Sequence, residues 1–311
     1  MGKIAFLFPG QGSQAVGMGK QLAENNKEVA KVFAKADEVL QDSLSEVIFE
    51  GPQEKLTLTT NAQPALLTTS FAILTALKEY DITPDFVAGH SLGEYSALVA
   101  AGALTFEDAV YAVRKRGEYM EEAVPGGEGA MAAILGADPH MLKQVTEEVT
   151  SEGYAVQIAN MNSTKQIVIS GTKQGVEVAS QRAKENGAKR AIPLKVSGPF
   201  HSSLMKPAAE KFQSVLNEIT IHDTNIPVIA NVTADVITRG ADIQEKLIEQ
   251  LYSPVLWYPS IECMVKQGVD TFIEIGPGKV LAGLMKSIDS SVKAYAIYDE
   301  ETLKDTISNL R

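Results

Sequence analysis

Residues 86–104 read FVAGHSLGEYSALVAAGAL, and they predict a strand, a sharp turn and a helix in direct succession. The apolar run from Phe86 to Ala88 is typical of a short buried strand. Small and apolar residues from Leu92 to Leu104 are typical of a helix packed close to a sheet. Between them lies G-x-S-x-G, in which glycines on both sides of Ser91 permit the strained turn that exposes a nucleophile. The stretch therefore favours an α/β fold with Ser91 at a nucleophilic turn.

The chain before this stretch follows the same order of strand and helix. Lys3 to Phe8 predicts a buried strand, which ends in a Pro-Gly loop, and a helix is expected to begin near Val16. Further helices are expected over 27–40 and over 63–80, with Pro64 in the first turn of the second. This alternation predicts a mostly parallel sheet covered by helices.

Residues 125–196 have a different order and are bounded by segments rich in Gly and Pro. The expected elements are strands over 129–135, 154–160, 166–170 and 191–196, and helices over 139–152 and 175–186. This β-α-β-β-α-β order is that of a ferredoxin-like α+β unit. We therefore predict an inserted subdomain over 125–196, within a large α/β catalytic domain formed by 1–124 and 197–311.

Composition excludes several classes of protein. The 311 residues are 45% hydrophobic, and their formal net charge of −11 argues against binding to nucleic acid. The single cysteine, Cys263, excludes an internal disulfide and a thiolate cluster for zinc, and is expected to serve packing. The early apolar run Ile4 to Phe8 is too short to span a membrane or to act as a signal peptide. A cytoplasmic protein without membrane contact is expected.

A nucleophilic serine needs a base, and the chain offers four histidines. His201 is favoured because it lies between a predicted strand and helix, where sites of α/β proteins are assembled. His90 is adjacent to Ser91, and neighbouring side chains at a sharp turn point apart. His222 lies in a polar loop and is the second choice, while His140 is expected at the surface.

No acidic residue between Ser91 and His201 follows a predicted strand of the large domain. The serine–acid–histidine order of the hydrolases is therefore not supported. We expect a dyad whose imidazole is oriented by another group, for example a backbone carbonyl.

Arg116 is a further candidate functional residue. On the helix that begins after Thr105, it lies at the edge of the apolar face formed by Phe106, Val113 and their neighbours. A guanidinium placed there needs a carboxylate partner. That partner is either an internal Glu or the carboxylate of a substrate.

The negative charge is not evenly spread, because residues 182–211 contain seven bases and two acids. One interpretation is a pair of solvated helix faces. The other is a docking patch for an anionic partner. The candidate patch residues are Lys184, Lys189, Arg190, Lys195 and Lys206.

Taken together, these motifs closely resemble the bacterial malonyl-CoA:acyl-carrier-protein transacylases of type II fatty-acid synthesis. The resemblance covers the whole chain. Its markers are FPGQGSQ (8–14), NAQPAL (61–66), GHSLGEY (89–95), RGEYM (116–120), GAMAAILG (129–136), FHS (200–202), QLYSPVLW (250–257) and EIGPGKVL (274–281).

The resemblance implies a hydrolase-like α/β domain with a ferredoxin-like insert, and roles for individual residues. Ser91 would be the acylated nucleophile and His201 its base. The backbone N–H groups of Gln11 and Leu92 would form the oxyanion hole. Arg116 would hold the free carboxylate of malonate.

Four further residues match the family with narrower roles. The main-chain carbonyl of Gln250 would orient His201. Gln63 and Asn162 match positions near the acyl group and the thioester-bearing arm. Phe200, directly before the histidine, accompanies malonyl rather than methyl-branched units in related enzymes. The Gly-Pro pair at 198–199 departs from the family pattern and puts the local loop shape in question.

The implied substrates are malonyl-CoA and the phosphopantetheine thiol of acyl carrier protein, joined in a ping-pong reaction. No metal or resident cofactor is implied, and a monomer is expected. Two other classes stay open: a serine thioesterase or hydrolase using the same Ser91 and His201, and a non-catalytic scaffold that keeps only the fold.

Overall fold

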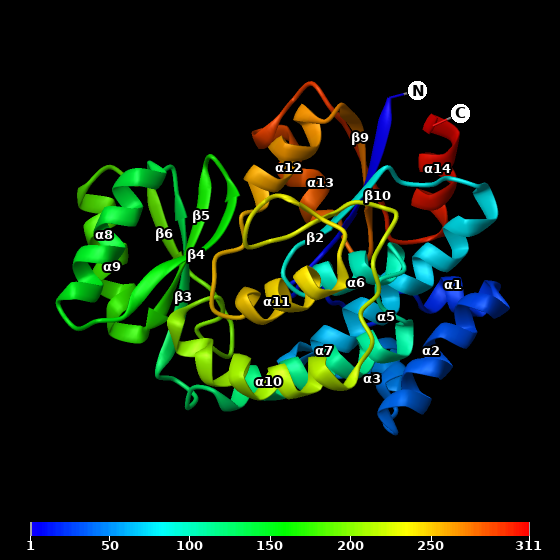
Figure 1. Ribbon diagram of the computed structural model, residues 1–311, viewed down its shortest axis with the longest axis horizontal. Coiled ribbons are helices and arrows are strands. Elements are labelled where there is room, and N and C mark those ends of the chain that lie inside the picture. Colours follow the sequence, from blue (N-terminus) through cyan, green and yellow to red (C-terminus); the bar gives the residue numbers. More distant parts are fainter. Residues whose placement is uncertain (1, 311) are drawn as a thin grey trace.

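The computed structural model describes residues 2–310, and these form two β-sheets (Figure 1). The larger sheet has the strand order β10-β9-β1-β2-β7-β8, and all its neighbours are parallel except β7 and β8. Its strands are β1 (Lys3–Phe8), β2 (Phe86–Gly89), β7 (Val228–Ile229), β8 (Val236–Ile237), β9 (Val269–Ile275) and β10 (Lys293–Ile297). The predicted mostly parallel sheet is thus confirmed.

Helices cover both faces of this sheet because its strand side chains alternate between two cores. Phe6 and Phe8 of β1 belong to one hydrophobic core, and Ala5 and Leu7 belong to the other. The helices on the first side are α1 (Lys20–Asn25), α2 (Lys27–Leu40), α3 (Leu44–Glu50), α4 (Gln53–Thr57), α5 (Thr59–Leu77), α6 (Gly93–Ala100), α7 (Phe106–Glu122), α10 (Lys206–Glu218), α11 (Gly240–Gln250) and α14 (Glu300–Leu310). Those on the second side are α12 (Trp257–Lys266) and α13 (Val280–Ile288). Short 3-10 turns span Lys78–Tyr80 and Ser203–Met205.

Two helix starts differ from the prediction by about four residues. The first helix begins at Lys20 rather than near Val16, because Gly17 and Gly19 have φ of 89° and 74° and hold the chain in turns. Helix α5 begins at Thr59, so Pro64 lies inside the helix and not in its first turn. Burial overrides the cost of that proline, since nearly every side chain of α5 is buried.

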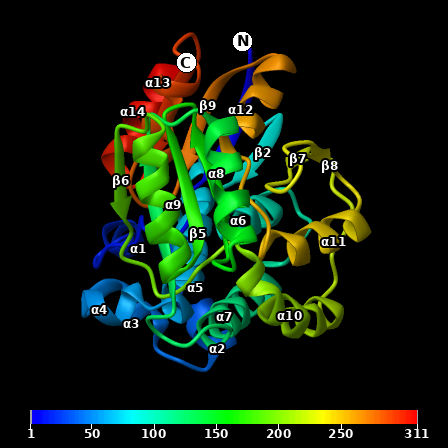
Figure 2. The ribbon, with the colours of Figure 1, turned by 90° about the vertical axis from the view of Figure 1, so that its left-hand side faces the viewer.

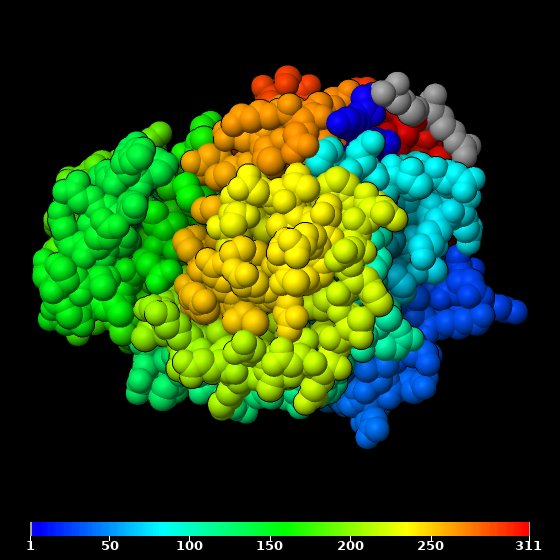
Figure 3. Space-filling view, viewed as in Figure 1, coloured from blue at the N-terminus to red at the C-terminus, as the bar shows by residue number. Residues whose placement is uncertain are grey.

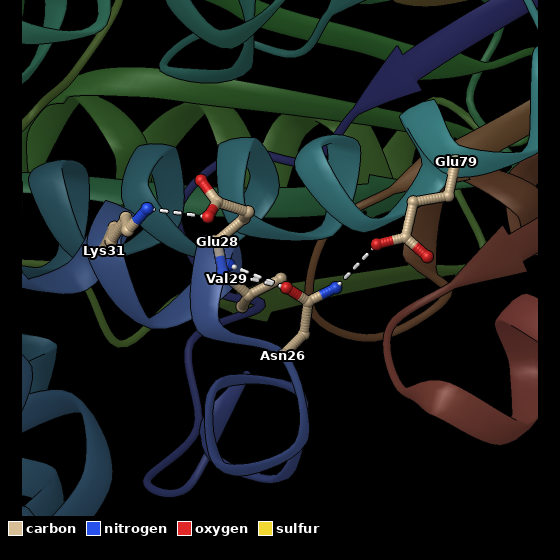
Figure 4. A network of polar contacts seen from close by, with 5 residues as sticks. All are labelled: Asn26, Glu28, Val29, Lys31 and Glu79. Carbon is tan, nitrogen blue, oxygen red and sulfur yellow. Dashed lines mark hydrogen bonds and ion pairs between the residues drawn. The ribbon is translucent and has the colours of Figure 1, made fainter.

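Helix α2 begins where the sequence predicts, and Asn26 explains why. Its side-chain oxygen accepts hydrogen bonds from the backbone N–H of Glu28 at 2.9 Å and of Val29 at 3.3 Å (Figure 4). Its amide nitrogen donates to Glu79 at 3.0 Å, at the end of the neighbouring helical segment. Asn26 therefore satisfies two of the free N–H groups of the helix start and ties α2 to the chain after α5.

The second sheet lies within the predicted insert, with the antiparallel order β4-β5-β3-β6. Its strands are β3 (Gly129–Leu135), β4 (Val156–Ser163), β5 (Gln166–Thr172) and β6 (Arg190–Pro193), and its helices are α8 (Pro139–Ser151) and α9 (Lys173–Glu185). These helices pack on one side of the sheet over a separate hydrophobic core (Figure 2). The order of elements is the predicted ferredoxin-like one.

The insert is joined to the large domain by main-chain contacts as well as by its two linkers. The N–H of Val255 donates to the oxygen of Ala159, and the N–H of Met161 donates to the oxygen of Val255, both at 2.8 Å. In the space-filling view the insert forms one end of the molecule, beside the surface of α10 and α11 (Figure 3). No helix within residues 2–310 is long and apolar enough to cross a membrane.

Candidate active site

A cleft of about 360 Å³ lies between the two sheets. The large domain contributes the loops that follow β1 and β2, and the insert contributes side chains of β3, β4 and β5. Loops after the carboxyl ends of parallel strands are where α/β proteins place their sites. The residues that line it include Gln11, His90, Ser91, Leu92, Arg116, Asn162, Lys195, Phe200 and His201.

Ser91 lies on a strained turn between β2 and α6. Its φ is 52°, a left-handed conformation that non-glycine residues rarely adopt. A Cβ on Gly89 would collide with the backbone of Gly93, and a Cβ on Gly93 would collide with the carbonyl of Phe8. The Ser91 N–H donates to Oδ1 of Asn231 at 2.7 Å, which helps to hold the turn. Both glycines of the motif are therefore required by close backbone contacts.

Ser91 and His201 form a hydrogen-bonded pair. The Ser91 Oγ lies 2.7 Å from Nε2 of His201, and His201 Nδ1 lies 2.8 Å from the main-chain oxygen of Gln250. Because that oxygen can only accept, Nδ1 carries the proton and Nε2 is left to accept from the serine hydroxyl. Burial, and then the charge of Arg116, lower the pKa of His201 to about 3. The imidazole is therefore neutral, and its Nε2 can accept a hydrogen bond from the serine hydroxyl.

The backbone of His201 is itself held in an unusual conformation. Its φ is 56°, and its side chain is only 3% exposed. Gln157 of the insert donates to the main-chain oxygens of His201 and Tyr252, both at 3.2 Å, and accepts from the N–H of Ser203 at 2.9 Å. The insert thus holds the histidine loop as well as lining the cleft.

Arg116 is buried at the floor of the cleft, with 1% of its side chain exposed. One terminal nitrogen donates to Oε1 of Gln63 at 2.8 Å. The other donates to Oε1 of Gln250 at 2.8 Å and to Oγ of Ser91 at 3.2 Å. Within residues 2–310 it makes no ion pair with a carboxylate, and its Nε has no partner. Of the two alternatives for its partner, the geometry favours a substrate carboxylate.

Gln11 and Leu92 both line the cleft that contains Ser91. The backbone N–H of neither residue donates a hydrogen bond to another group in the part of the chain that is described. Leu92 directly follows Ser91 and precedes the first turn of α6, where N–H groups are free. The two donors are available to an oxyanion.

The chain is similar to proteins of a known family. The model of the acyl transferase domain matches residues 5–302. The chain belongs to the acyl transferase family. A malonyl CoA-acyl carrier protein transacylase of Bacillus subtilis (strain 168) is 65% identical over 311 residues, which are 100% of this chain and 98% of the relative.

Solved acyl transferases have the same fold. A malonyl CoA-acyl carrier protein transacylase from Clostridium perfringens is 45% identical, with a TM-score of 0.96 and coverage of 99% of this chain and 97% of that one. A malonyl-transacylase in complex with its type II PKS acyl-carrier protein is 44% identical, with a TM-score of 0.96 and coverage of 99% of both chains. The predicted family and the fold class are confirmed, and the chain is an acyltransferase.

Three other predicted residues of this acyl transferase lie at or near the cleft. Phe200 and Asn162 line it, and Asn162 Oδ1 lies 2.8 Å from Nε2 of His90. In the described chain His90 makes this contact with Asn162, and the Ser91 hydroxyl meets His201 instead. Gln63 is buried beneath the lining and meets the site through its contact with Arg116.

The predicted basic patch divides into paired and unpaired residues. Arg182 forms a two-pronged pair with Glu152, and Lys211 pairs with Glu122 at 2.9 Å. The five candidate patch residues are exposed, and within residues 2–310 none of them forms an ion pair. Of these five, Lys195 lines the cleft itself.

Sequence reasoning missed Asn231, Glu94 and Gln157. Asn231 donates to the oxygen of Gly89 at 2.7 Å and accepts from the N–H of Ser91, so its amide bridges the turn at Ser91. A signal was present, because Asn231 follows β7, a parallel neighbour of β2. Glu94 and Gln157 act through long-range contacts that no local pattern marks.

Proposed function

We propose that this acyl transferase moves malonyl from malonyl-CoA to the phosphopantetheine thiol of an acyl carrier protein, through a malonyl ester on Ser91. The observation that carries the proposal is the joint contact of the Ser91 hydroxyl with His201 and Arg116, at 2.7 Å and 3.2 Å. A nucleophile, its base and a cation for the distal carboxylate are thus brought to one point.

In the first half-reaction, His201 Nε2 takes the hydroxyl proton as Ser91 Oγ attacks the thioester carbonyl. The developing oxyanion is bound by the N–H groups of Gln11 and Leu92. Collapse of the intermediate breaks the C–S bond, and the leaving thiolate takes the proton from His201. The products are coenzyme A and malonyl-Ser91.

In the second half-reaction the carrier-protein thiol gives its proton to His201 and attacks the serine ester. The C–O bond then breaks, and Ser91 recovers its proton. Thioester and ester are both reactive enough that the proposed steps need no resident cofactor. Transfer prevails over hydrolysis only where water is kept from the ester.

Arg116 is the residue that supports malonyl as the transferred acyl group. A malonyl group carries a free carboxylate, which a buried guanidinium can bind in a two-pronged geometry. Phe200 lines the cleft together with His201, and a bulky ring at this position suits malonyl better than methyl-branched acyl groups. Neutralising Arg116 also removes one cause of the low pKa of His201, so the bound carboxylate makes the histidine a better base.

An acyl carrier protein is the proposed acceptor because a relative of this fold is solved in complex with such a protein. The unpaired bases Lys189, Arg190 and Lys195 suit an acidic partner. A serine thioesterase is the competing function, since it would use the same Ser91 and His201 and release free malonate.

Intact mass spectrometry after mixing with malonyl-CoA tests the proposal. We expect one malonyl adduct, absent from Ser91→Ala, that passes to added carrier protein faster than it is hydrolysed. Absence of the adduct, or its persistence in Ser91→Ala, would contradict the covalent mechanism. Release as free malonate despite carrier protein would identify a thioesterase.

A further inference from the structure

The site contains one buried carboxyl group that the proposed steps do not use. Glu94, in the first turn of α6, is 1% exposed. Its Oε2 accepts from Nε2 of Gln250 at 2.6 Å and from the N–H of Asn231 at 3.2 Å. Its Oε1 has no partner in the described chain. Because a buried carboxylate is costly, its place three residues after Ser91 calls for a reason.

The side chain of Gln250 connects Glu94 to Arg116. Its Oε1 accepts from Arg116 at 2.8 Å, while its Nε2 donates to Glu94 and, at 3.1 Å, to the main-chain oxygen of Ser91. An amide can lie in either of two orientations, and only its hydrogen-bond partners select one. An ionised Glu94 accepts hydrogen bonds only, so it turns the NH₂ group toward α6. The amide oxygen must then face the guanidinium.

Two titratable or charged groups of the described chain interact with the Glu94 carboxyl. They are the guanidinium of Arg116, on α7, and the phenol of Tyr95, on the same helix as Glu94. Burial raises the pKa of Glu94 to about 7, against the opposing effects of Gln250, Asn231 and Arg116. The carboxyl can therefore change its charge near neutral pH.

Building on the proposed function, we propose that Glu94 is a positioning residue for malonyl selection. In its ionised form it fixes the Gln250 amide, and this amide holds Arg116 in place for the substrate carboxylate. Protonation of Glu94 replaces a hydrogen bond to a charged acceptor by a weaker one to a neutral group, so the Gln250 amide and Arg116 are held less firmly. Transfer of malonyl should then weaken, whereas transfer of acetyl, which has no carboxylate for Arg116, should change little.

The test compares kcat/KM for malonyl-CoA and acetyl-CoA between about pH 5 and pH 9, where this constant reports groups of the free enzyme. In the wild type, the malonyl-to-acetyl ratio should fall as the pH drops through the pKa of Glu94, about 7. In Glu94→Gln the ratio should be lower by about tenfold at high pH, the loss expected for one hydrogen bond to a charged group. The fall near neutral pH should be absent from that variant.

Glu274→Gln is the matched control, because Glu274 is equally buried but binds the N–H of Ala282 at the start of α13, outside the cleft. It should keep the wild-type ratio and pH profile. A Glu94→Gln enzyme with the wild-type ratio and profile would overturn the inference, and so would an equal loss with both substrates.

Two further results distinguish failure of the inference on Glu94 from misfolding of the variant and from failure of the proposed function. If Glu94→Gln does not fold, the wild-type profile decides, and a malonyl-to-acetyl ratio independent of pH overturns the inference. The proposed function fails by a different result, namely the absence of a malonyl adduct from the wild-type serine.

Discussion

Ser91 and His201 meet at 2.7 Å although both hold the left-handed backbone conformation, with φ of 52° and 56°. Such conformations are costly for non-glycine residues and persist only where surrounding contacts impose them. For Ser91 those contacts come from Asn231, and for His201 they come from Gln157. The pair is therefore set by the backbone before any substrate binds.

In the proposed mechanism the two residues act as one unit, so the effects of their removal should not be additive. Ser91→Ala and His201→Ala should each lower kcat by roughly 10⁴-fold or more, and the double variant should lose little beyond either single one. Steady-state rates of malonyl transfer test this. His222→Ala, at an exposed loop histidine, should leave the rate unchanged. A double variant whose loss is the product of both single losses would show that the residues act independently.

Removal of the buried guanidinium of Arg116 should affect the transfer of malonyl and of acetyl differently. Arg116→Ala should weaken transition-state binding of malonyl by about 2–5 kcal/mol, the cost of removing one member of a desolvated charge pair, with little effect on acetyl. Since Arg116 lowers the pKa of His201, the acid limb of kcat/KM for acetyl should also move to higher pH.

The neighbouring Arg114 supplies the control for that experiment. It lies on the same helix, pairs with Asp42 at 3.2 Å and does not line the cleft. Arg114→Ala should affect stability and leave the preference for malonyl intact. An unchanged preference in Arg116→Ala would assign that arginine a structural role only.

The turn at Ser91 should tolerate no side chain at Gly89. A Cβ there meets the backbone of Gly93 and Glu94, so Gly89→Ala should cost about 3 kcal/mol or more and abolish transfer. Gly283→Ala makes the same change in α13, where a Cβ meets open space, and should stabilise the protein by roughly 0.5–1 kcal/mol. Chemical denaturation measures both values. A Gly89→Ala protein as stable as the wild type would refute the steric argument.

The sequence predicts well where local rules decide. Glycine spacing and apolar periodicity predict the turn at Ser91 and helix α2, because these signals lie within a few residues of the structure they produce. For α5 the sequence predicts a start four residues too late, since its first turn is stabilised by burial that the sequence does not display. Tertiary contacts override the local preference of Pro64.

In the candidate site, too, the residues marked by local sequence are predicted and those that act through distant contacts are not. Ser91 carries a motif, and Arg116 is marked by its position on an apolar helix face. Asn231 carries neither, because its contact with the turn joins residues 140 positions apart. Glu94 lies within the recognised motif, yet its contact with Gln250 spans 156 positions and appears only in three dimensions.

The N-terminal cap of helix α2 should affect the stability of the protein and not its activity. Asn26→Ala removes the acceptor for two N–H groups and should lower the free energy of unfolding by about 1 kcal/mol. Asn26→Ser keeps a capping oxygen and should recover most of that loss, although it lacks the amide that reaches Glu79. Thermal unfolding measures the difference. Malonyl transfer should be unchanged, and an equal loss of stability in both variants would show that the Glu79 contact dominates.

The unpaired bases of the insert should govern the encounter with carrier protein. The double variant Lys189→Glu and Arg190→Glu should have a higher KM for carrier protein. Its kcat/KM should also depend less on salt, because attraction between opposite charges is what salt screens. Lys143→Glu is the control, since Lys143 is an exposed base of the same subdomain that lies on α8, outside the stretch 182–211. A neutral acceptor, free pantetheine, should react equally with all these enzymes. If the double reversal leaves both KM and the salt dependence at wild-type values, the acidic partner docks elsewhere.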